Sequence, residues 1–256
     1  MTDFSHNIHR PPHTFLPGAS YFVSARTYFA LPYLKDDACK QILLDNIQKA
    51  VEKFLLTLFG WIILDNHYHL LLKLPKEDNK INLVSPVGRK SDRLQPVILG
   101  KVMGFIHGRS SRFLRKREVQ ETQSAVYDFT PQEFALLKHG FLKCLGGKYL
   151  LTERRRMQRF KQLIDAGDIK GLNKFMKTTP KIWYQYLEHV IANEADFYRH
   201  LNYIHQNPVK HGFCKDLLDY KFSSIHKYIE EFGKEWIVDC FRKYPIIDFQ
   251  PNFEDW

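Results

Sequence analysis

Residues 55–74 read LLTLFGWIILDNHYHLLLKL, two apolar runs separated by an Asp-Asn pair. Runs of this length, rich in leucine and isoleucine and bounded by turn residues, are typical of buried β-strands. Asp65 and Asn66 favour a turn between the runs, and Pro75 ends the second run because proline cannot donate to a strand ladder. The stretch therefore predicts two buried strands that follow each other closely.

Two further segments predict strands. Residues 21–28, YFVSARTY, are aromatic and β-branched, which favours a strand early in the chain. Residues 183–191, WYQYLEHVI, have the same character and predict a fourth and last strand.

Helical patterns lie between and after these strands. Residues 36–53 carry apolar side chains at helical spacing, behind acidic residues that suit a helix N-terminus. Residues 97–117 predict a long helix with a basic end and an interruption near Gly108. A last helix is expected to begin at Asn193 and to end at Pro208.

Residues 118–180 differ in character from the rest of the chain. Thr130 to Glu133 form a capping box with proline at the first helical position. Residues 152–166 and 168–177 are further helical candidates, separated by Gly167. We therefore predict an all-helical insertion at 118–180, which could clamp a ligand through its arginines, cover the functional site, or form a solvated appendage.

Without the insertion the predicted order is β, α, β, β, α, β, α. This order indicates an α+β fold, a ferredoxin-like sandwich in which helices cover a mostly antiparallel sheet. Residues 1–117 and 181–256 would form this discontinuous domain.

Composition narrows the function classes. The chain has 256 residues and is 44% hydrophobic, which excludes wholesale disorder. It has no apolar run long enough to span a membrane, and its first residues lack the apolar core of a signal peptide, so we expect a cytoplasmic protein. The four cysteines show no C-x-x-C spacing, which favours reduced thiols. A formal net charge of +10 favours polyanionic partners such as nucleic acids.

His67 and His69 are the first chemical feature. Side chains at i and i+2 of a strand share a face, so the two imidazoles project together while Tyr68 points the other way. Two neutral imidazoles can hold a divalent cation, although a complete site needs a further ligand. Such a pair also occurs by chance on half-exposed strands without any metal.

Tyr203 is the second feature, on the helix that begins at Asn193. Phe197, Leu201 and Ile204 form the apolar stripe of that helix, and Tyr203 is predicted to lie away from it, near the polar side.

Asp196, His200 and Asn207 fall on the same side of the helix as Tyr203. A phenol in this position becomes a useful nucleophile if a metal polarises the phosphate it attacks, and Asn207 offers a ligand oxygen. Tyr198, at a different angle on the helix, is the alternative nucleophile. An ordinary tyrosine at a helix edge is the other interpretation.

Basic side chains gather on the long helix, in the loop before it and in the insertion. One face of the long helix could track phosphates, or these residues could form solvated charged faces. The candidates for nucleic-acid binding are Arg89, Lys90, Arg93, Arg109, Arg112, Arg115, Lys116, Arg154, Arg155 and Arg156.

Four stretches together resemble a known family. They are IILDNHYHLLLKLP, MGFIHGRSSRFLRKRE, FYRHLNYIHQNPVKHGF and YKFSSIHKYI. In this order they resemble the REP-associated tyrosine transposases, relatives of the insertion-sequence transposases built on the single-tyrosine HUH endonuclease domain. The resemblance covers roughly residues 20–117 and 181–229. The region that corresponds to residues 118–180 is usually short in the family. The resemblance therefore does not define the substrate-binding surface of this chain.

The resemblance implies a metal-dependent single-stranded DNA endonuclease and strand transferase. His67 and His69 would be the metal ligands, Asn207 a third ligand, and Mg²⁺ or Mn²⁺ the metal. Tyr203 would attack a phosphodiester, leaving a 5′-phosphotyrosine link and a free 3′-hydroxyl. The substrate implied is single-stranded DNA with a hairpin, of the repetitive extragenic palindrome type, in the bacterial cytoplasm and nucleoid.

Other interpretations remain open at this stage. The chain could be a catalytically silent regulator that binds hairpin DNA or RNA on the same fold. The active enzyme could be a monomer or a homodimer, with the site in one chain or composed from two.

Overall fold

The computed structural model describes residues 16–76, 97–121, 151–178 and 181–246. Three of the basic candidates, Arg89, Lys90 and Arg93, lie outside these ranges, as does the capping box at Thr130 to Glu133.

Four strands form one sheet with the order β2-β3-β1-β4. The strands are β1 (Ser20–Thr27), β2 (Thr57–Ile63), β3 (His67–Lys73) and β4 (Trp183–Val190). Each neighbouring pair is antiparallel, which confirms the predicted antiparallel sheet. Because β3 lies between β1 and β2, the first two strands are joined by a crossover that spans one strand.

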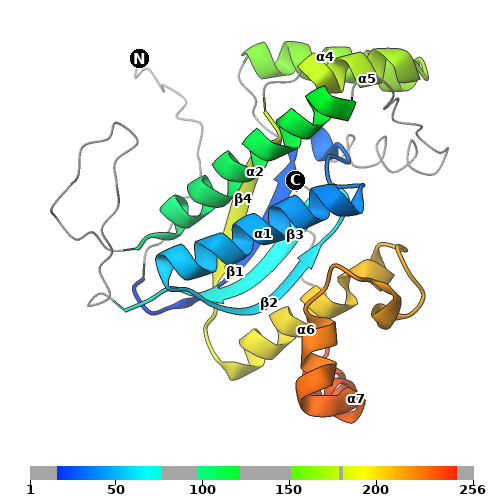
Figure 1. Ribbon diagram of the computed structural model, residues 1–256. Helices are drawn as coiled ribbons and strands as arrows, with labels where there is room; N and C mark the ends of the chain where they lie inside the picture. Colours follow the sequence, from blue (N-terminus) through cyan, green and yellow to red (C-terminus); the bar gives the residue numbers. More distant parts are fainter. Residues whose placement is uncertain (1–15, 77–96, 122–150, 179–180, 247–256) are drawn as a thin grey trace, which may run out of the picture.

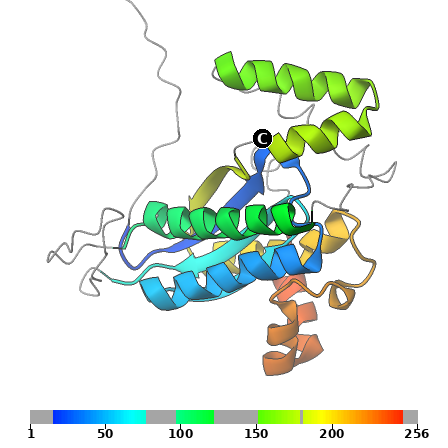
Figure 2. The same cartoon turned by 45° about the horizontal axis from the view of Figure 1, so that its top comes forward.

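Helices cover both faces of the sheet (Figures 1 and 2). Helices α1 (Asp37–Phe54) and α2 (Leu99–Glu121) lie side by side on one face. Helix α6 (Glu194–Lys210) lies on the other face, against β2 and β3. The order β1-α1-β2-β3-α2-β4 with this strand arrangement confirms the ferredoxin-like α+β sandwich.

The two predicted helices of the region 151–178 are present as α4 (Leu151–Asp165) and α5 (Ile169–Thr178). They pack against each other beyond the end of α2 (Figure 2). Their apolar side chains Phe160, Leu163 and Leu172 are buried and continue the core that lies between the sheet, α1 and α2. The two helices are therefore joined to the main core.

Helix α7 (Ile225–Lys243) follows α6 and packs on it. The sequence analysis predicts no helix in this region. Inside α7 the backbone departs from helical geometry at Gly233, where φ is 84°. The short 3₁₀ helices η1 (Tyr28–Ala30) and η2 (Leu217–Asp219) complete the described elements. Among the described helices, none is both long and apolar enough to cross a membrane.

Two predicted helix boundaries were wrong. Helix α2 continues through Gly108, because a helical glycine costs only about 1 kcal/mol relative to alanine and packing offsets it. Helix α6 continues past Pro208 to Lys210. The actual end signal is Gly212, whose φ of 72° places it in the left-handed region that typically ends helices.

The approach of α6 to the sheet depends on Gly60 in β2. A Cβ added there would lie 2.8 Å from Cδ1 of Leu201, which is fully buried on α6. The strand pairing shifts register next to this glycine, between Leu58 and Gly60. The absence of a side chain at Gly60 therefore favours close packing of the helix on the strand.

Replacing Gly60 by alanine should lower the free energy of unfolding by about 1–3 kcal/mol, because the added methyl overpacks a buried contact. The matched control is Gly104→Ala in α2, where an added Cβ meets no atom within 4 Å. That change should raise stability by about 0.5–1 kcal/mol through helix propensity. Urea unfolding measures both, and equal effects of the two substitutions would contradict the packing argument.

Candidate active site

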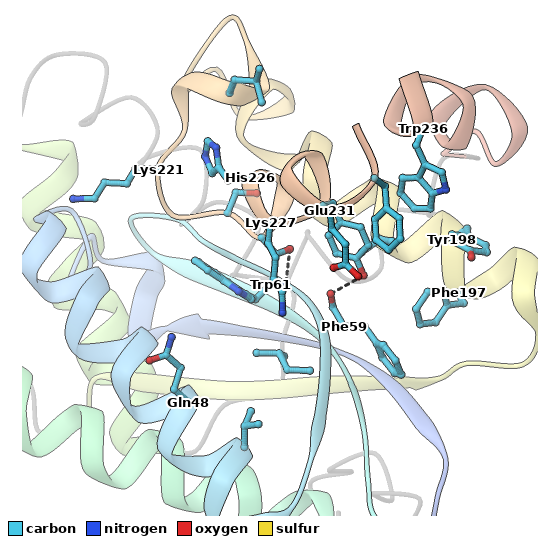
Figure 3. Close-up of a pocket in the computed structure, with 18 of the residues that line it drawn as sticks. Gln48, Phe59, Trp61, Phe197, Tyr198, Lys221, His226, Lys227, Glu231 and Trp236 are labelled. Carbon is cyan, nitrogen blue, oxygen red and sulfur yellow. Dashed lines mark hydrogen bonds between the residues drawn. The ribbon is translucent and has the colours of Figure 1, made fainter. Parts of the chain in front are cut away.

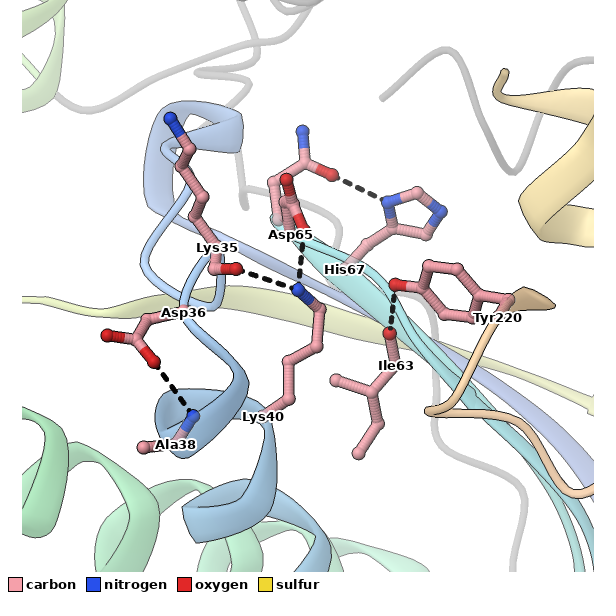
Figure 4. Close-up of polar contacts among 9 residues, drawn as sticks. Lys35, Asp36, Ala38, Lys40, Ile63, Asp65, His67 and Tyr220 are labelled. Carbon is pink, nitrogen blue, oxygen red and sulfur yellow. Dashed lines mark hydrogen bonds and ion pairs between the residues drawn. The ribbon is translucent and has the colours of Figure 1, made fainter. Parts of the chain in front are cut away.

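The turn between β2 and β3 is fixed by a buried ion pair (Figure 4). Lys40 of α1 is only 4% exposed, and its Nζ lies 2.7 Å from Oδ1 of Asp65. The same Nζ donates to the backbone carbonyl of Lys35 at 2.9 Å. Because a buried ammonium needs such partners, the turn is tied to the start of α1.

Asn66 ties the same turn to β1. Its backbone carbonyl accepts from the backbone N–H of Thr27 at 2.8 Å and from the Thr27 hydroxyl at 3.0 Å. Its side-chain Nδ2 donates to the carbonyl of Ala30 at 3.1 Å. The residue that precedes His67 is therefore held on both its backbone and its side chain.

Asn66 also orients the His67 ring. Its Oδ1 lies 2.7 Å from Nδ1 of His67, and an amide oxygen can only accept, so Nδ1 carries the proton. The lone pair of the neutral ring then lies on Nε2. A hydrogen bond of this kind on the far nitrogen is how proteins orient histidine ligands of metals.

His69 lies on the same face as His67, as predicted from the strand period. The two ring centroids are 5.2 Å apart. His69 is 2% exposed, and neither ring nitrogen has a hydrogen-bond partner among the described residues. Tyr68 points to the opposite face, where its hydroxyl lies 2.8 Å from Nε2 of His107.

Both histidines of the pair are held neutral. Burial, followed by the nearby His211, lowers the pKa of His67 to about 3, although contact with the Asn207 amide offsets part of the shift. Burial and then the neighbouring His67 lower the pKa of His69 well below its usual value. Neutral imidazole is the form that binds metals, so both rings are ready ligands at pH 7.

Helix α6 brings Tyr203 to these histidines. The helix begins as predicted, with Asn193 capping it by accepting from the N–H of Asp196 at 2.9 Å. The Tyr203 ring lies 5.3 Å from the His69 ring and 5.8 Å from the Phe22 ring, between centroids. Tyr203 lies on the same side of α6 as His200 and Asn207, in line with the helical spacing, but this side is buried, since Tyr203 is 3% exposed and packs with Leu201.

The reason is that this side of α6 faces the sheet, where His200 and Tyr203 lie against Phe22 and Tyr203 also lies against His69. Residues His200, Tyr203 and Asn207, which follow at intervals of three and four along the helix, are all buried. The polar stripe therefore packs into the molecule alongside the apolar stripe instead of facing solvent.

Asn207 completes the group. It is fully buried, and neither its Oδ1 nor its Nδ2 has a hydrogen-bond partner among the described residues. Leaving such atoms unsatisfied costs about 1–3 kcal/mol each. A ring nitrogen of His69 and the amide oxygen of Asn207, both without hydrogen-bond partners among the described residues, lie near the oriented Nε2 of His67, and these three atom types fit a divalent cation.

Three residues near the pair were missed by the sequence interpretation. Arg26 of β1 is paired in register with His67, and Lys210 places its ammonium 5.1 Å from the centroid of the Tyr203 ring. His211 follows Asn207 by one turn. Extending the i+4 spacing from Tyr203 through Asn207 would have found His211, whereas Arg26 required the strand register.

A second group of possible metal ligands lies at the start of α6. His189, Asp196 and His200 offer ligand atoms within 4.8 Å of one another, which is compatible with a divalent metal. The Asp196 carboxylate is 2.9 Å from Nε2 of His189 and 3.1 Å from Nδ1 of His200. The side chains of this second group already form hydrogen bonds or ion pairs with one another, whereas the ring nitrogens of His69 and the amide of Asn207 have no such partners among the described residues.

Tyr198, the alternative nucleophile, lies apart from the histidine pair. Its ring stacks on Tyr244 with centroids 4.8 Å apart. It lines a cavity of about 1140 Å³ between β2, α6 and α7, together with Phe197, Trp61 and Trp236 (Figure 3). The charged residues of this cavity have mixed signs, since Lys221 and Lys227 lie with Asp219 and Glu231.

The basic candidates do not gather at the histidine pair. Helix α2 lies on the opposite face of the sheet, where Nε of Arg109 donates to the side chain of Asn46 at 3.1 Å. Arg112, Arg115, Arg155 and Arg156 are exposed. Lys116 and Arg154 lie in α2 and α4, and nothing further is described of their side chains.

Comparison with known proteins confirms the resemblance over part of the chain. A REP-associated tyrosine transposase of Escherichia coli K12 is 44% identical over 48 residues, 19% of this chain and 27% of that protein. A Haemophilus influenzae Rd protein, assigned provisionally by its name to the same family, is 38% identical over 58 residues, 22% and 33% of the two chains. The chain thus spans a third or less of these curated relatives.

A solved structure of a REP-associated tyrosine transposase bound to a REP hairpin aligns with 89% of this chain and 84% of its own. The TM-score is 0.46 and the sequence identity 16%. No family model matches the chain.

The protonation of His67 predicts a pH-dependent stability. An unfolded histidine titrates near pH 6.5, whereas folded His67 titrates at about 3. Its stabilising contribution is complete above pH 6.5 and is lost as the pH falls toward 3. When the pH is lowered from 7 to 5, the free energy of unfolding should therefore fall by about 1–2 kcal/mol less in His67→Asn than in the wild type. Urea unfolding with a chelator present measures this difference. If His67→Asn kept the wild-type dependence of stability on pH, the neutral state assigned to His67 would be incorrect.

Proposed function

We propose that this chain, similar over part of its length to the REP-associated tyrosine transposases, is a metal-dependent single-stranded DNA endonuclease and strand transferase. Its substrate would be hairpin DNA, as the resemblance to the REP-associated tyrosine transposases implies. The single observation that carries the proposal is that four side chains lie next to one another where α6 packs on the sheet. They are His67, His69, Asn207 and Tyr203.

Each of these residues has a distinct part in the proposed reaction. The Nε2 lone pair of His67, a ring nitrogen of His69 and the amide oxygen of Asn207 would hold a divalent cation. When bound, such an ion would polarise the scissile phosphate and stabilise the negative charge that develops on its oxygens. Tyr203 would supply the attacking hydroxyl from α6, next to His69.

The covalent step balances as a transesterification. The hydroxyl oxygen of Tyr203 forms a bond to phosphorus and loses its proton, while the bond from phosphorus to the 3′-oxygen breaks and that oxygen gains a proton. The product is a 5′-phosphotyrosine link and a free 3′-hydroxyl. Because one phosphoester replaces another, a 3′-hydroxyl can reverse the step and rejoin strands without ATP.

Positive charge near Tyr203 supports a phosphate substrate. Lys210 lies over the Tyr203 ring, and Arg26 and Lys210 are both close enough to His67 to lower its pKa. Exposed Arg155 and Arg156 on α4 would contact DNA farther from the scissile phosphate, with residues 118–180 acting as an added binding region.

All groups of the proposed site belong to one chain, so we infer that the site forms without a partner subunit.

Trapping a covalent adduct tests the proposal. A labelled single-stranded DNA hairpin with a short flanking sequence is incubated with Mn²⁺ and the protein, and the products are resolved under denaturing conditions. The wild type should form a protein–DNA adduct. Tyr203→Phe should form none, because it lacks only the attacking oxygen.

The control is Tyr198→Phe, which changes a tyrosine on the same helix that stacks on Tyr244. It should retain the wild-type adduct yield. An adduct that persists in Tyr203→Phe and disappears in Tyr198→Phe would reverse the assignment. Hairpin binding without an adduct from the wild type would favour the silent binding protein instead.

A further inference from the structure

The face of the sheet that carries the histidine pair extends from β3 onto β1. Ser24 of β1 is paired in register with His69. Arg26, two residues further along β1, is paired in register with His67. Side chains directly opposite each other in antiparallel strands share a face, with Cβ atoms about 4.5–5.5 Å apart. Ser24 and Arg26 are only partly buried, so both can contact a ligand that is bound at the histidine pair.

Arg26 brings a positive charge to this face without an acidic partner. Among the described residues its guanidinium forms no ion pair, whereas the buried ammonium of Lys40 is paired with Asp65. Cζ of Arg26 lies 5.4 Å from the centroid of the Tyr184 ring on the neighbouring strand β4. A guanidinium that rests on an aromatic ring and has no carboxylate beside it is suited to binding an anion.

We propose that Arg26 binds a backbone phosphate next to the scissile one, so that the single strand crosses β1 and β4. Tyr184 is then a positioning residue, which holds the guanidinium through its ring. The inference rests on the proposed function, which places the scissile phosphate at the histidine pair. Arginine suits this task because its planar fork of donors binds phosphate oxygens in pairs.

Charge favours this path over the opposite one, which leads toward the cavity between β2, α6 and α7. The lysines that line that cavity, Lys221 and Lys227, are accompanied by Asp219 and Glu231. Their net attraction for a polyanion is therefore weaker than that of a cation without a carboxylate partner.

Fluorescence anisotropy with two labelled DNAs tests the inference, with a chelator present and over a range of salt concentrations. One DNA is a hairpin with an unpaired flank, and the other is the same hairpin without the flank. The wild type should bind the flanked hairpin more tightly.

Arg26→Gln should weaken binding of the flanked hairpin about tenfold at low salt, because a charge-assisted hydrogen bond is lost. It should also reduce the slope of log affinity against log salt concentration by about 0.7, the value for one phosphate contact on a single strand. Binding of the hairpin without the flank should stay unchanged. Equal weakening of both DNAs would overturn the inference, because Arg26 would then contact the hairpin.

The matched control is Lys227→Gln, which removes an exposed positive charge at the cavity. It should keep the wild-type affinity and salt dependence for both DNAs. If Lys227→Gln lowers the slope and Arg26→Gln does not, the strand runs toward α7 and the inference is wrong. Tyr184→Leu should weaken binding of the flanked hairpin less than Arg26→Gln does and keep the slope, because the charge remains.

The outcomes separate this inference from the proposed function. A wild type that binds neither DNA overturns both. A wild type that forms the covalent adduct, together with an unchanged affinity and slope in Arg26→Gln, overturns the role of Arg26 alone. Thermal unfolding accompanies each titration, and if Arg26→Gln melts early, Arg26→Met, which keeps an apolar stem without the charge, carries the same expectations.

Discussion

The packing of α6 against β1, β2 and β3 is the contact on which the proposed chemistry depends. Leu201 and Ile204 fill the apolar part of this contact, and Gly60 lets the helix approach the strand closely. The same contact places Tyr203 beside His69. A displacement of α6 by one turn, about 5.4 Å, would separate the tyrosine from the histidines while keeping much of the apolar burial.

This contact buries polar groups as well as apolar ones, and the burial of the polar groups lowers the free energy of unfolding. His69 and Asn207 bury polar atoms without hydrogen-bond partners, and such atoms destabilise the folded state. The Lys40–Asp65 ion pair and the hydrogen bonds of Asn66 fix the turn that precedes His67. Buried polar atoms without partners, grouped at one place, are typical of a ligand-binding site.

Much of the fold was predictable because local patterns decide it. The alternation of His67, Tyr68 and His69 fixed their faces, and Asn193 marked the start of α6 through its capping side chain. The burial of Tyr203 was not predictable, because helical spacing separates apolar from polar residues and does not reveal that the polar stripe packs on the sheet beside Phe22 and His69. Arg26 likewise depends on the register between β1 and β3, which no local pattern contains.

The most direct test of the account is the position of the ion in crystals grown with Mn²⁺, located by its anomalous scattering. The account predicts one peak with nitrogens of His67 and His69 within about 2.2 Å, close to usual metal–imidazole distances, and with Tyr203 of the same chain beside it. A peak only between His189, Asp196 and His200 would contradict it, as would a Tyr203 supplied by another chain.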